Sequence, residues 1–178
     1  MEHVVLLSDA GEPIGAAPKA GVHGLATPLH LAFSCYVHDD DGRLLVTRRA
    51  LTKQSWPGVW TNSFCGHPRP AEPLADAVRR HARRELGAEL VDLQLVLPDF
   101  RYRAVDPSGV MENEMCPVFR ARALGGLDPA PDEVLEHAWV RPADLARAAR
   151  LTPWAFSPWL VLQLDKLPLV ADPGRAAA

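Results

Sequence analysis

The sequence has 178 residues, of which 48% are hydrophobic and 23% are charged, proportions that are ordinary for a globular protein with a substantial core. The formal net charge of −3 and the pI near 6.1 exclude a general electrostatic attraction to nucleic acid or to anionic membranes. The three cysteines, Cys35, Cys65 and Cys116, are an odd number at wide spacing, which predicts no disulfide framework and fits a reducing cytoplasm.

Short strands separated by turns are predicted at the start of the chain. The N-terminus lacks the basic segment and the apolar length of a signal peptide, and residues 4–7 are typical of a strand that ends in a turn. Residues 29–37 alternate, so we expect a strand with His30 on the face opposite its apolar side chains. The segment HDDDGR predicts a hairpin with Asp41-Gly42 at its tip, and residues 44–47 form the returning strand.

A basic segment follows this hairpin. The sequence RRALTK places three cations together: Arg48, Arg49 and Lys53. A run of charges is often only a solvated face. This run leads directly into a stretch rich in bulky and rigid residues, so a contact with an anion is the other interpretation.

That stretch, WPGVWTNSFCGHP at residues 56–68, puts Cys65 two residues before His67. Gly66 lies between them and permits backbone geometries that other residues resist. Both side chains could therefore point at one site. A buried free cysteine and a histidine bonded to the backbone is the alternative, because free cysteine is among the most buried residue types.

Residues 73–86 carry the clearest helical pattern. Apolar residues recur every four positions in one stripe, and Gly87 suits the C-terminal cap. At about 100° per residue, Glu85 projects toward the buried side of this helix. Because a lone buried carboxylate is costly, we expect Glu85 to pair with an arginine or to bind a metal ion.

Two acidic residues lie on one predicted strand. Residues 112–121 have the pattern of a strand in which Pro117 implies an edge or a bulge. Glu112 and Glu114 are two positions apart, so both side chains leave the same face. Like charges this close repel each other unless a cation lies between them or one carboxylate is protonated. Simple solvent exposure of both residues is the alternative.

The remaining elements complete an α+β pattern. We predict strands at 93–97, 100–104 and 137–140, a turn at 106–109, and helices at 142–149 and from 152 to about 167. No repeat or linker is visible, so we expect one domain over residues 1–178, with a mixed sheet packed between helices and a disordered tail at 168–178. No apolar stretch approaches the length of a membrane span.

Five segments together resemble the type 1 isopentenyl-diphosphate delta-isomerase family: RLLVTRRALTKQSWPGVWTNS, SFCGHP, PDFRYRA, ENEMCPVF and TPWAFSPW. The resemblance covers residues 3–164 and implies the Nudix fold. Five positions of the Nudix sequence pattern are present: Gly66, Glu72, Arg80, Glu85 and Gly87. His81 and Arg84 stand where Nudix hydrolases have carboxylates that hold magnesium, and this departure favours an isomerase over a hydrolase.

The resemblance also implies a metal site and a diphosphate site. In similar proteins one divalent metal is bound by the residues that match His23, His30, His67, Glu112 and Glu114. Imidazole and carboxylate ligands together suit zinc, manganese or magnesium. The counterpart of Glu85 helps to hold a magnesium ion on the substrate diphosphate, and three basic residues near that diphosphate match Lys19, Arg49 and Lys53.

The reaction implied by the resemblance is the reversible conversion of isopentenyl diphosphate to dimethylallyl diphosphate in isoprenoid biosynthesis. Protonation of the alkene gives a tertiary cation, and removal of another proton completes the shift of the double bond. Cys65 and Glu114 match the acid and base. Tyr102 matches a tyrosine that hydrogen-bonds near the glutamate, and Trp159 matches a tryptophan whose ring shelters the cation.

Two other functions remain open on the sequence. A Nudix-type hydrolase would release phosphate from a diphosphate substrate, and a non-catalytic binding domain would keep only the fold. For the isomerase we expect a small isoprenyl diphosphate as the partner, a cytoplasmic location, and a monomer or weak homodimer. We expect no nucleic-acid partner and no insertion into a membrane.

Overall fold

The structure is a computed structural model that describes residues 2–167. Its strands are His3–Leu7 (β1), Pro13–Pro18 (β2), His30–Leu31 (β3), Phe33–His38 (β4), Leu44–Arg49 (β5), Trp60–Thr61 (β6), Phe64–Gly66 (β7), Glu89–Leu97 (β8), Arg101–Val105 (β9), Met111–Met115 (β10), Val118–Leu124 (β11) and Val134–Val140 (β12). Its helices are Lys19–Val22 (α1), Leu74–Leu86 (α2), Pro142–Leu151 (α3) and Pro158–Leu164 (α4), with a 3₁₀ turn at Pro153–Ala155 (η1). The tail predicted at 168–178 lies outside the described residues.

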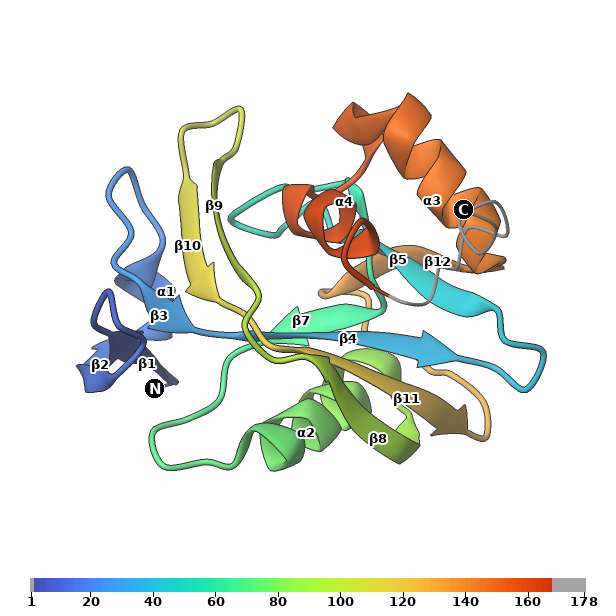
Figure 1. Ribbon diagram of the computed structural model, residues 1–178, viewed down its shortest axis with the longest axis horizontal. Helices are drawn as coiled ribbons and strands as arrows, with labels where there is room; N and C mark the ends of the chain where they lie inside the picture. Colours follow the sequence, from blue (N-terminus) through green and yellow to red (C-terminus); the bar gives the residue numbers. More distant parts are fainter. Residues whose placement is uncertain (1, 168–178) are drawn as a thin grey trace, which may run out of the picture.

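The strands form two mixed sheets (Figure 1). Strand β3 of the first sheet continues along the chain into β4 of the second, and β10 continues into β11. The first sheet has the order β2-β1-β3-β10-β9, and the second has the order β12-β5-β4-β11-β8, with β6 on β5 and β7 on β4. In the first sheet β3 and β10 are parallel, and in the second sheet their continuations β4 and β11 are also parallel. Within the described residues the chain therefore passes from one sheet to the other three times: at Ala32, at residues 98–100 between β8 and β9, and at residues 116–117.

The prediction of one continuous strand over 112–121 is wrong, because this segment is divided between β10 and β11. Pro117 has no N–H to donate to a neighbouring strand, and its carbonyl accepts a hydrogen bond from the Ser34 N–H at 3.1 Å. The Cys116 N–H instead bonds the Phe100 carbonyl at 2.8 Å. The predicted strand over 29–37 is divided in the same way at Ala32. These paired breaks place the ends of β3 and β10 beside each other.

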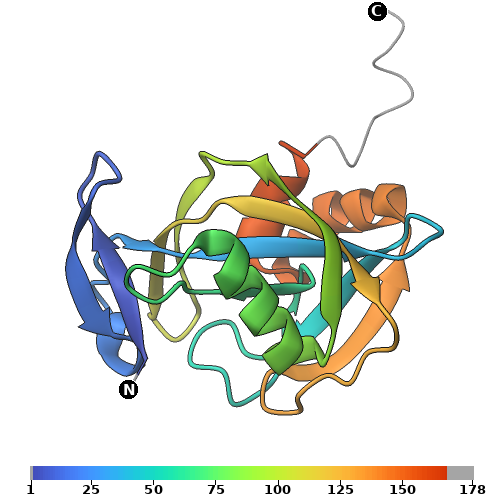
Figure 2. The ribbon, with the colours of Figure 1, turned by 90° about the horizontal axis from the view of Figure 1, so that it is seen from below.

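β4 is buried on both faces, between two hydrophobic cores. Phe33 and Cys35 pack in the core that contains Val78 of α2, whereas Tyr36 packs in the core that contains Leu160 of α4. In Figure 1, α2 lies below β4 while α3 and α4 lie above it, and Figure 2 shows α2 crossing the near side of the strands. The prediction of an α+β fold with mixed strands between helices is confirmed.

The helix α2 follows the prediction closely. Val78, Ala82 and Leu86 are buried along one stripe, and Gly87 ends the helix in the left-handed conformation (φ 62°), with its N–H bonded to the Ala82 carbonyl. Such a cap satisfies a carbonyl that the helix leaves free. The buried position predicted for Glu85 is also confirmed.

The prediction of one last helix from 152 to 167 is wrong in its extent. The segment is divided into η1 and α4, with Ser157 between them in an extended conformation (φ −64°, ψ 140°). A residue before proline disfavours the helical region, so Pro158 starts a new helix instead of continuing the old one. Among residues 2–167, no helix is both long and apolar enough to span a bilayer.

Candidate active site

Strand register brings polar side chains to one face at the bend between the two sheets. Glu114 of β10 is the register partner of His30 on β3 and of Tyr102 on β9. Register partners on adjacent strands present their side chains to the same face. Glu112, two positions earlier on β10, leaves that face too, as the sequence predicted.

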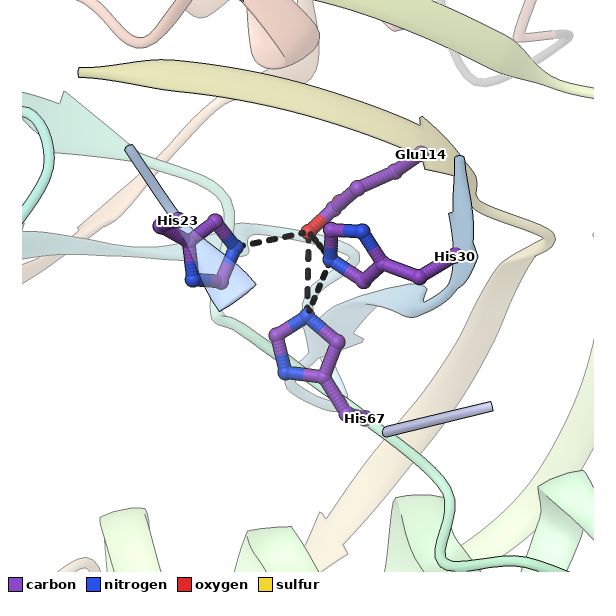
Figure 3. Close-up of side chains that lie close together, drawn as sticks. All are labelled: His23, His30, His67 and Glu114. Carbon is purple, nitrogen blue, oxygen red and sulfur yellow. Dashed lines mark hydrogen bonds and ion pairs between the residues drawn. The ribbon is translucent and has the colours of Figure 1, made fainter. Parts of the chain in front are cut away.

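Three imidazoles converge on the Glu114 carboxylate (Figure 3). Glu114 Oε1 lies 3.1 Å from His67 Nε2, 3.4 Å from His30 Nε2 and 3.9 Å from His23 Nε2. One ligand atom from each of the four residues lies within 4.8 Å of the others. Two ligands at about 2.1 Å from one tetrahedral ion are about 3.4 Å apart, so these separations fit a shared metal ion.

A hydrogen bond orients one of these histidines, and burial favours the neutral form of another. His30 Nδ1 lies 2.9 Å from the Pro28 carbonyl, and because a carbonyl only accepts, Nδ1 carries a hydrogen and the ring is oriented with Nε2 toward the group. Burial lowers the pKa of His67 to about 4. His30 Nε2 and His67 Nε2 are 3.2 Å apart, a separation at which a cation or a proton is needed to offset repulsion between lone pairs.

His23 and the two carboxylates form the charged part of the group. Burial disfavours a charge on His23, but ion pairing with the Glu112 and Glu114 carboxylates, 2.9 and 3.9 Å from its Nε2, outweighs it and raises the pKa of His23 to about 9. Burial likewise disfavours a charge on Glu114, yet the three imidazoles lower its pKa well below the ordinary value. Without a metal, a proton on His23 compensates the buried carboxylates.

Within residues 2–167, three buried polar atoms of this group lack a hydrogen-bond partner: His23 Nε2, His67 Nδ1 and Glu112 Oε2. Glu112 Oε2 and His23 Nε2 are an ion pair at 2.9 Å but are not aligned as a hydrogen bond, and Glu112 Oε1 accepts a hydrogen bond from the Ser55 hydroxyl. Glu112 thus stands at the edge of the four-residue group rather than inside it. Unsatisfied buried atoms are costly, and a divalent cation would satisfy Glu112 and His23 together. The donor set therefore fits a metal ion such as zinc or manganese.

A cavity of about 420 Å³ opens beside this group. Its lining includes most of the residues predicted for the site: Lys19, His23, Arg49, Lys53, Cys65, His67, Tyr102, Glu112 and Glu114. The Tyr102 hydroxyl donates to Glu114 Oε2 at 2.9 Å, and burial raises the pKa of Tyr102 well above its ordinary range, so Tyr102 stays protonated. Cys65 and Glu114, predicted as the acid and base, thus line the same cavity.

Cys65 reaches the cavity from β7. The pairing of β7 with β4 sets Cys65 opposite Ser34, and burial raises the pKa of the thiol to about 12, so Cys65 is a protonated thiol at neutral pH. The predicted reason for Gly66 is wrong, since Gly66 is not among the described glycines with a left-handed backbone. Gly66 is needed instead for close packing, because a Cβ there would lie 2.6 Å from the His81 ring.

The three predicted diphosphate contacts line the cavity, and each has a partner within the protein. Lys19 Nζ lies 3.1 Å from Glu2 Oε2, and Lys53 forms an ion pair with Glu133. Arg49 donates to the backbone carbonyl of Ser55 at 2.8 Å. An incoming anion would therefore compete with these internal acceptors.

Glu85 lies outside the group of four metal-binding candidates. Its Oε1 is 2.5 Å from His81 Nδ1, so the partner of this buried carboxylate is a histidine one helical turn away and not an arginine. Arg84 pairs with Glu133 at 3.0 Å. The Nudix pattern expects carboxylates at positions 81 and 84. This chain has His81 and Arg84 there, and each pairs with an acidic residue.

Trp159 lies behind the cavity rather than on its surface. It is buried, its ring centroid is 5.7 Å from those of Trp56 and Tyr102, and the lining residues do not include it. The Arg49 guanidinium lies over the indole, 5.3 Å from its centroid. The ring face already accommodates a cation in this structure.

Sequence reasoning missed several residues that hold the site together. Ser55 bonds Glu112, Glu133 pairs with Lys53, and Ser34 and Asn62 contact the Cys65 sulfur. Asn62 lies inside the motif at 56–68 and Ser55 directly precedes it. Their place in the sequence could have marked them as site residues, but their contacts could not be read from it. Glu133 follows an irregular, proline-containing segment that offers no periodicity.

Comparisons with known proteins define the class first. A crystal structure of a protein from Deinococcus radiodurans has a TM-score of 0.73 at 19% identity and covers 94% of this chain and 99% of its own. A MutT NUDIX hydrolase from Burkholderia pseudomallei has a TM-score of 0.60 at 23% identity, covering 77% and 96%. The NUDIX domain family matches residues 28–160 by sequence. The chain is therefore a NUDIX-fold protein.

Closer relatives then identify the family. An isopentenyl-diphosphate Delta-isomerase from Agromyces mediolanus is 66% identical over 169 residues, covering 95% of this chain and 82% of the relative. Proteins of the same name from Clavibacter michiganensis subsp. michiganensis and Brevibacterium linens are 64% and 57% identical, covering 93% and 97% of this chain and 86% and 95% of theirs. The chain belongs to the isopentenyl-diphosphate Delta-isomerase family, and its NUDIX fold makes it type 1.

Proposed function

We propose that this protein catalyses the reversible conversion of isopentenyl diphosphate to dimethylallyl diphosphate, with Cys65 and Glu114 as the two groups that exchange protons with the substrate. One observation carries this proposal beyond family membership. Cys65 and Glu114 arrive from different sheets and line the same cavity of about 420 Å³, so an alkene in this cavity can meet both groups.

The chemistry of the substrate explains why two proton-exchanging groups are needed. A carbon–hydrogen bond beside an isolated alkene is too weakly acidic for a side chain to remove its proton first. One group therefore protonates the terminal carbon to give a tertiary cation, and the other removes a different proton to complete the shift of the double bond. Tyr102 would pass a proton to or from that carboxylate, and its hydrogen bond to Glu114 at 2.9 Å supports this role.

The group of His23, His30, His67 and Glu114, with Glu112 at its edge, would hold one divalent metal ion: zinc, manganese or magnesium. When bound, the metal would set the proton affinity of Glu114 through its charge. Support comes from the convergence of four ligand atoms within 4.8 Å and from the buried unsatisfied atoms of His23 and Glu112. The histidine ligands would also hold the segment containing His23 against the sheets.

The diphosphate of the substrate would bind beside the three basic residues that line the cavity. There Lys19, Arg49 and Lys53 would exchange their internal acceptors for phosphate oxygens, the arginine through its fork geometry and the lysines as point charges. Glu85 would help to hold a magnesium ion on this diphosphate, in place of its present contact with His81.

Trp159 would shelter the cationic intermediate. The Arg49 guanidinium over the indole supports this role, because it marks a face where a cation is favourable. Movement of Arg49 toward the diphosphate would leave this face available. A desolvated cation over indole gains about 2 kcal/mol.

Two further expectations belong to this proposal. We propose that residues 1–178 form one domain, since the two cores share β4, and that the protein acts in the cytoplasm as a monomer or weak homodimer. The free state of Cys35, Cys65 and Cys116 is compatible with a reducing compartment. Sedimentation of the pure protein over a range of concentrations would test the oligomeric state.

A proton NMR assay in heavy water tests the proposal directly. The protein is incubated with isopentenyl diphosphate and added zinc and magnesium, and we expect dimethylallyl diphosphate with deuterium incorporated and no release of phosphate. Release of phosphate without the isomer would replace the proposal with a hydrolase. The pairing of His81 with Glu85 and of Arg84 with Glu133 makes that outcome the less expected one.

A further inference from the structure

Asn62 lies directly behind the cavity wall that carries Cys65. Its side chain is fully buried, and its Nδ2 donates to the backbone carbonyls of Cys35 at 3.0 Å and of Phe64 at 2.7 Å. A carbonyl can only accept hydrogen bonds, so these two contacts fix the orientation of the amide. The other end of the amide, Oδ1, is therefore an acceptor held in one place.

That oxygen accepts hydrogen bonds from both the proposed acid–base residue and the proposed cation shelter. The Cys65 thiol donates to Asn62 Oδ1 at 3.2 Å, and the Trp159 indole N–H donates to the same atom at 3.0 Å. The Thr61 hydroxyl is a third donor, at 2.9 Å. One fixed atom thus sets the direction of the thiol hydrogen and the position of the indole.

The opposite side of the Cys65 sulfur is held as well. Ser34 Oγ lies 3.3 Å from Cys65 Sγ and accepts a hydrogen bond from Gln163 Nε2 at 2.9 Å. Gln163 is oriented in turn by the Tyr36 hydroxyl, which donates to its Oε1 at 2.9 Å. The thiol therefore lies between a fixed acceptor and a fixed hydroxyl, and its rotation about the Cβ–Sγ bond is restricted.

We propose that Asn62 is a positioning residue that aligns the Cys65 thiol and the Trp159 indole through its single carbonyl oxygen. Asn62 does not line the cavity, so it acts on the reaction through the groups that it bonds and not by touching the substrate. The effect on turnover rests on the proposed isomerase function, whereas the hydrogen bonds themselves exist in the protein without substrate. The two parts can therefore be tested separately.

The first test uses the free protein. In Asn62→Ala, we expect the S–H stretching band of Cys65, isolated by subtracting the infrared spectrum of Cys65→Ala, to move to higher wavenumber because the thiol loses its acceptor. The indole N–H resonance of Trp159, assigned with Trp159→Phe, should shift at the same time. An unchanged thiol band or an unchanged indole resonance in folded Asn62→Ala would overturn the proposal.

Ser63→Ala provides the matched control. Ser63 is the next residue, is equally buried, and bonds the Val37 N–H and the Leu45 carbonyl, both at 2.7 Å, without touching Cys65 or Trp159 in any described contact. We expect this variant to lose stability but to keep both spectroscopic signatures. Equal spectral changes in the two variants would show that Asn62 acts only through general packing, and would overturn the proposal.

A second variant covers the case in which Asn62→Ala does not fold. Trp159→Phe removes one donor from Asn62 Oδ1 and leaves the amide in place. The thiol hydrogen bond should then strengthen, and the Cys65 S–H band should move to lower wavenumber. An unmoved band would mean that the thiol and the indole do not share this oxygen.

Kinetics complete the test. In Asn62→Ala, kcat should fall about tenfold, the loss expected from one hydrogen bond that matters in the transition state, while KM stays near that of the wild type because no substrate contact is removed. A rise in KM at constant kcat would overturn the positioning role. If the wild-type protein shows no isomerisation at all, the proposed function fails, and the spectroscopic result still decides whether Asn62 holds the thiol and the indole.

Discussion

The two walls of the cavity are built on different principles. The histidine–glutamate wall consists of His23, His67, Glu112 and Glu114 with the His30 side chain behind them, and the thiol wall consists of Cys65 with the Asn62 and Ser34 side chains behind it. In the first wall, charged and polar groups crowd together and three buried atoms lack hydrogen-bond partners within residues 2–167. In the second wall, the sulfur and the side chains behind it are neutral and engaged in hydrogen bonds.

This difference indicates which wall depends on something outside the chain. An unpaired buried polar group costs free energy, so the histidine–glutamate wall is incomplete until a cation or protons arrive. The thiol wall is complete as the chain folds. We therefore expect metal to affect the first wall only, and the following variants and conditions separate the two walls.

The largest effect should come from Glu114→Gln. This change removes the carboxylate shared by three imidazoles, so activity should fall by about 100- to 10,000-fold and metal affinity should fall with it. The isomerisation assay and calorimetric titration with zinc measure the two losses. Glu136→Gln is the matched control, because Glu136 is an exposed carboxylate paired with Arg48. Glu114→Gln with normal activity would refute the assignment.

Cys65→Ala should lose activity over a similar range of about 100- to 10,000-fold, but its affinity for zinc should match that of the wild type. The reason is that the sulfur contacts Ser34 and Asn62 and is absent from the metal-binding group. Cys35→Ala, a change at a buried cysteine in the other core, should keep its activity. Weakened metal binding in Cys65→Ala would show that the two walls are not independent.

Removal of metal should destabilise only the histidine–glutamate wall. At a metal concentration of about 100 times Kd, binding stabilises the folded state by about 2.7 kcal/mol, which corresponds to a Tm shift on the order of 5–10 °C for a chain of this size. A chelator should lower the Tm of the wild type and of Cys65→Ala equally. An identical shift in Glu114→Gln would place the stabilising metal elsewhere.

Trp159→Leu should have an intermediate effect. Loss of about 2 kcal/mol of cation stabilisation lowers the rate about 30-fold if it is confined to the transition state, and it leaves metal affinity unchanged. Steady-state kinetics give the rate, and Trp154→Leu is the control, because Trp154 is 81% exposed. An unchanged rate in Trp159→Leu would mean that the ring does not shelter the intermediate.

The sequence was more informative about the histidine–glutamate wall than about the thiol wall. The two-residue spacing of Glu112 and Glu114 is sufficient to place both on one face of a strand, and the helical position of Glu85 is sufficient to bury it. Such inferences need only the geometry of one element. The grouping of His23 with His30 came from the family resemblance, because no local pattern connects two residues from different segments.

The contacts behind the thiol could not be predicted, because they depend on strand pairing. Ser34 meets Cys65 only because β7 pairs with β4 in one register, and Asn62 meets Trp159 across 97 positions of sequence. The division of β10 from β11 is a similar case. Pro117 signalled an irregularity, but the outcome, a change of sheet, depends on where the Cys116 N–H finds a partner in space.

The smallest effect should come from Glu72→Gln, which lies outside both walls. Glu72 accepts hydrogen bonds from Arg80 Nε at 2.8 Å and from an Arg80 terminal nitrogen, Nη2, at 2.7 Å, and that same nitrogen donates to the His67 carbonyl at 3.1 Å. The amide variant should lose about 1 kcal/mol of unfolding free energy, measured by urea denaturation.

The pH dependence of this loss follows from the Glu72 pKa. The hydrogen bond from Arg80 is the largest influence, and the pKa of Glu72 is lowered to about 2 from an ordinary 4.5. A carboxylate with a depressed pKa stabilises the fold above its ordinary pKa, and this contribution is lost as the pH falls through the folded value. The difference between wild type and Glu72→Gln should therefore be constant above about pH 5 and shrink toward pH 2. Arg80 can still donate to the His67 carbonyl in Glu72→Gln, so the affinity for zinc should be preserved. A marked loss of zinc affinity would show that the histidine–glutamate wall depends on residues at the start of α2.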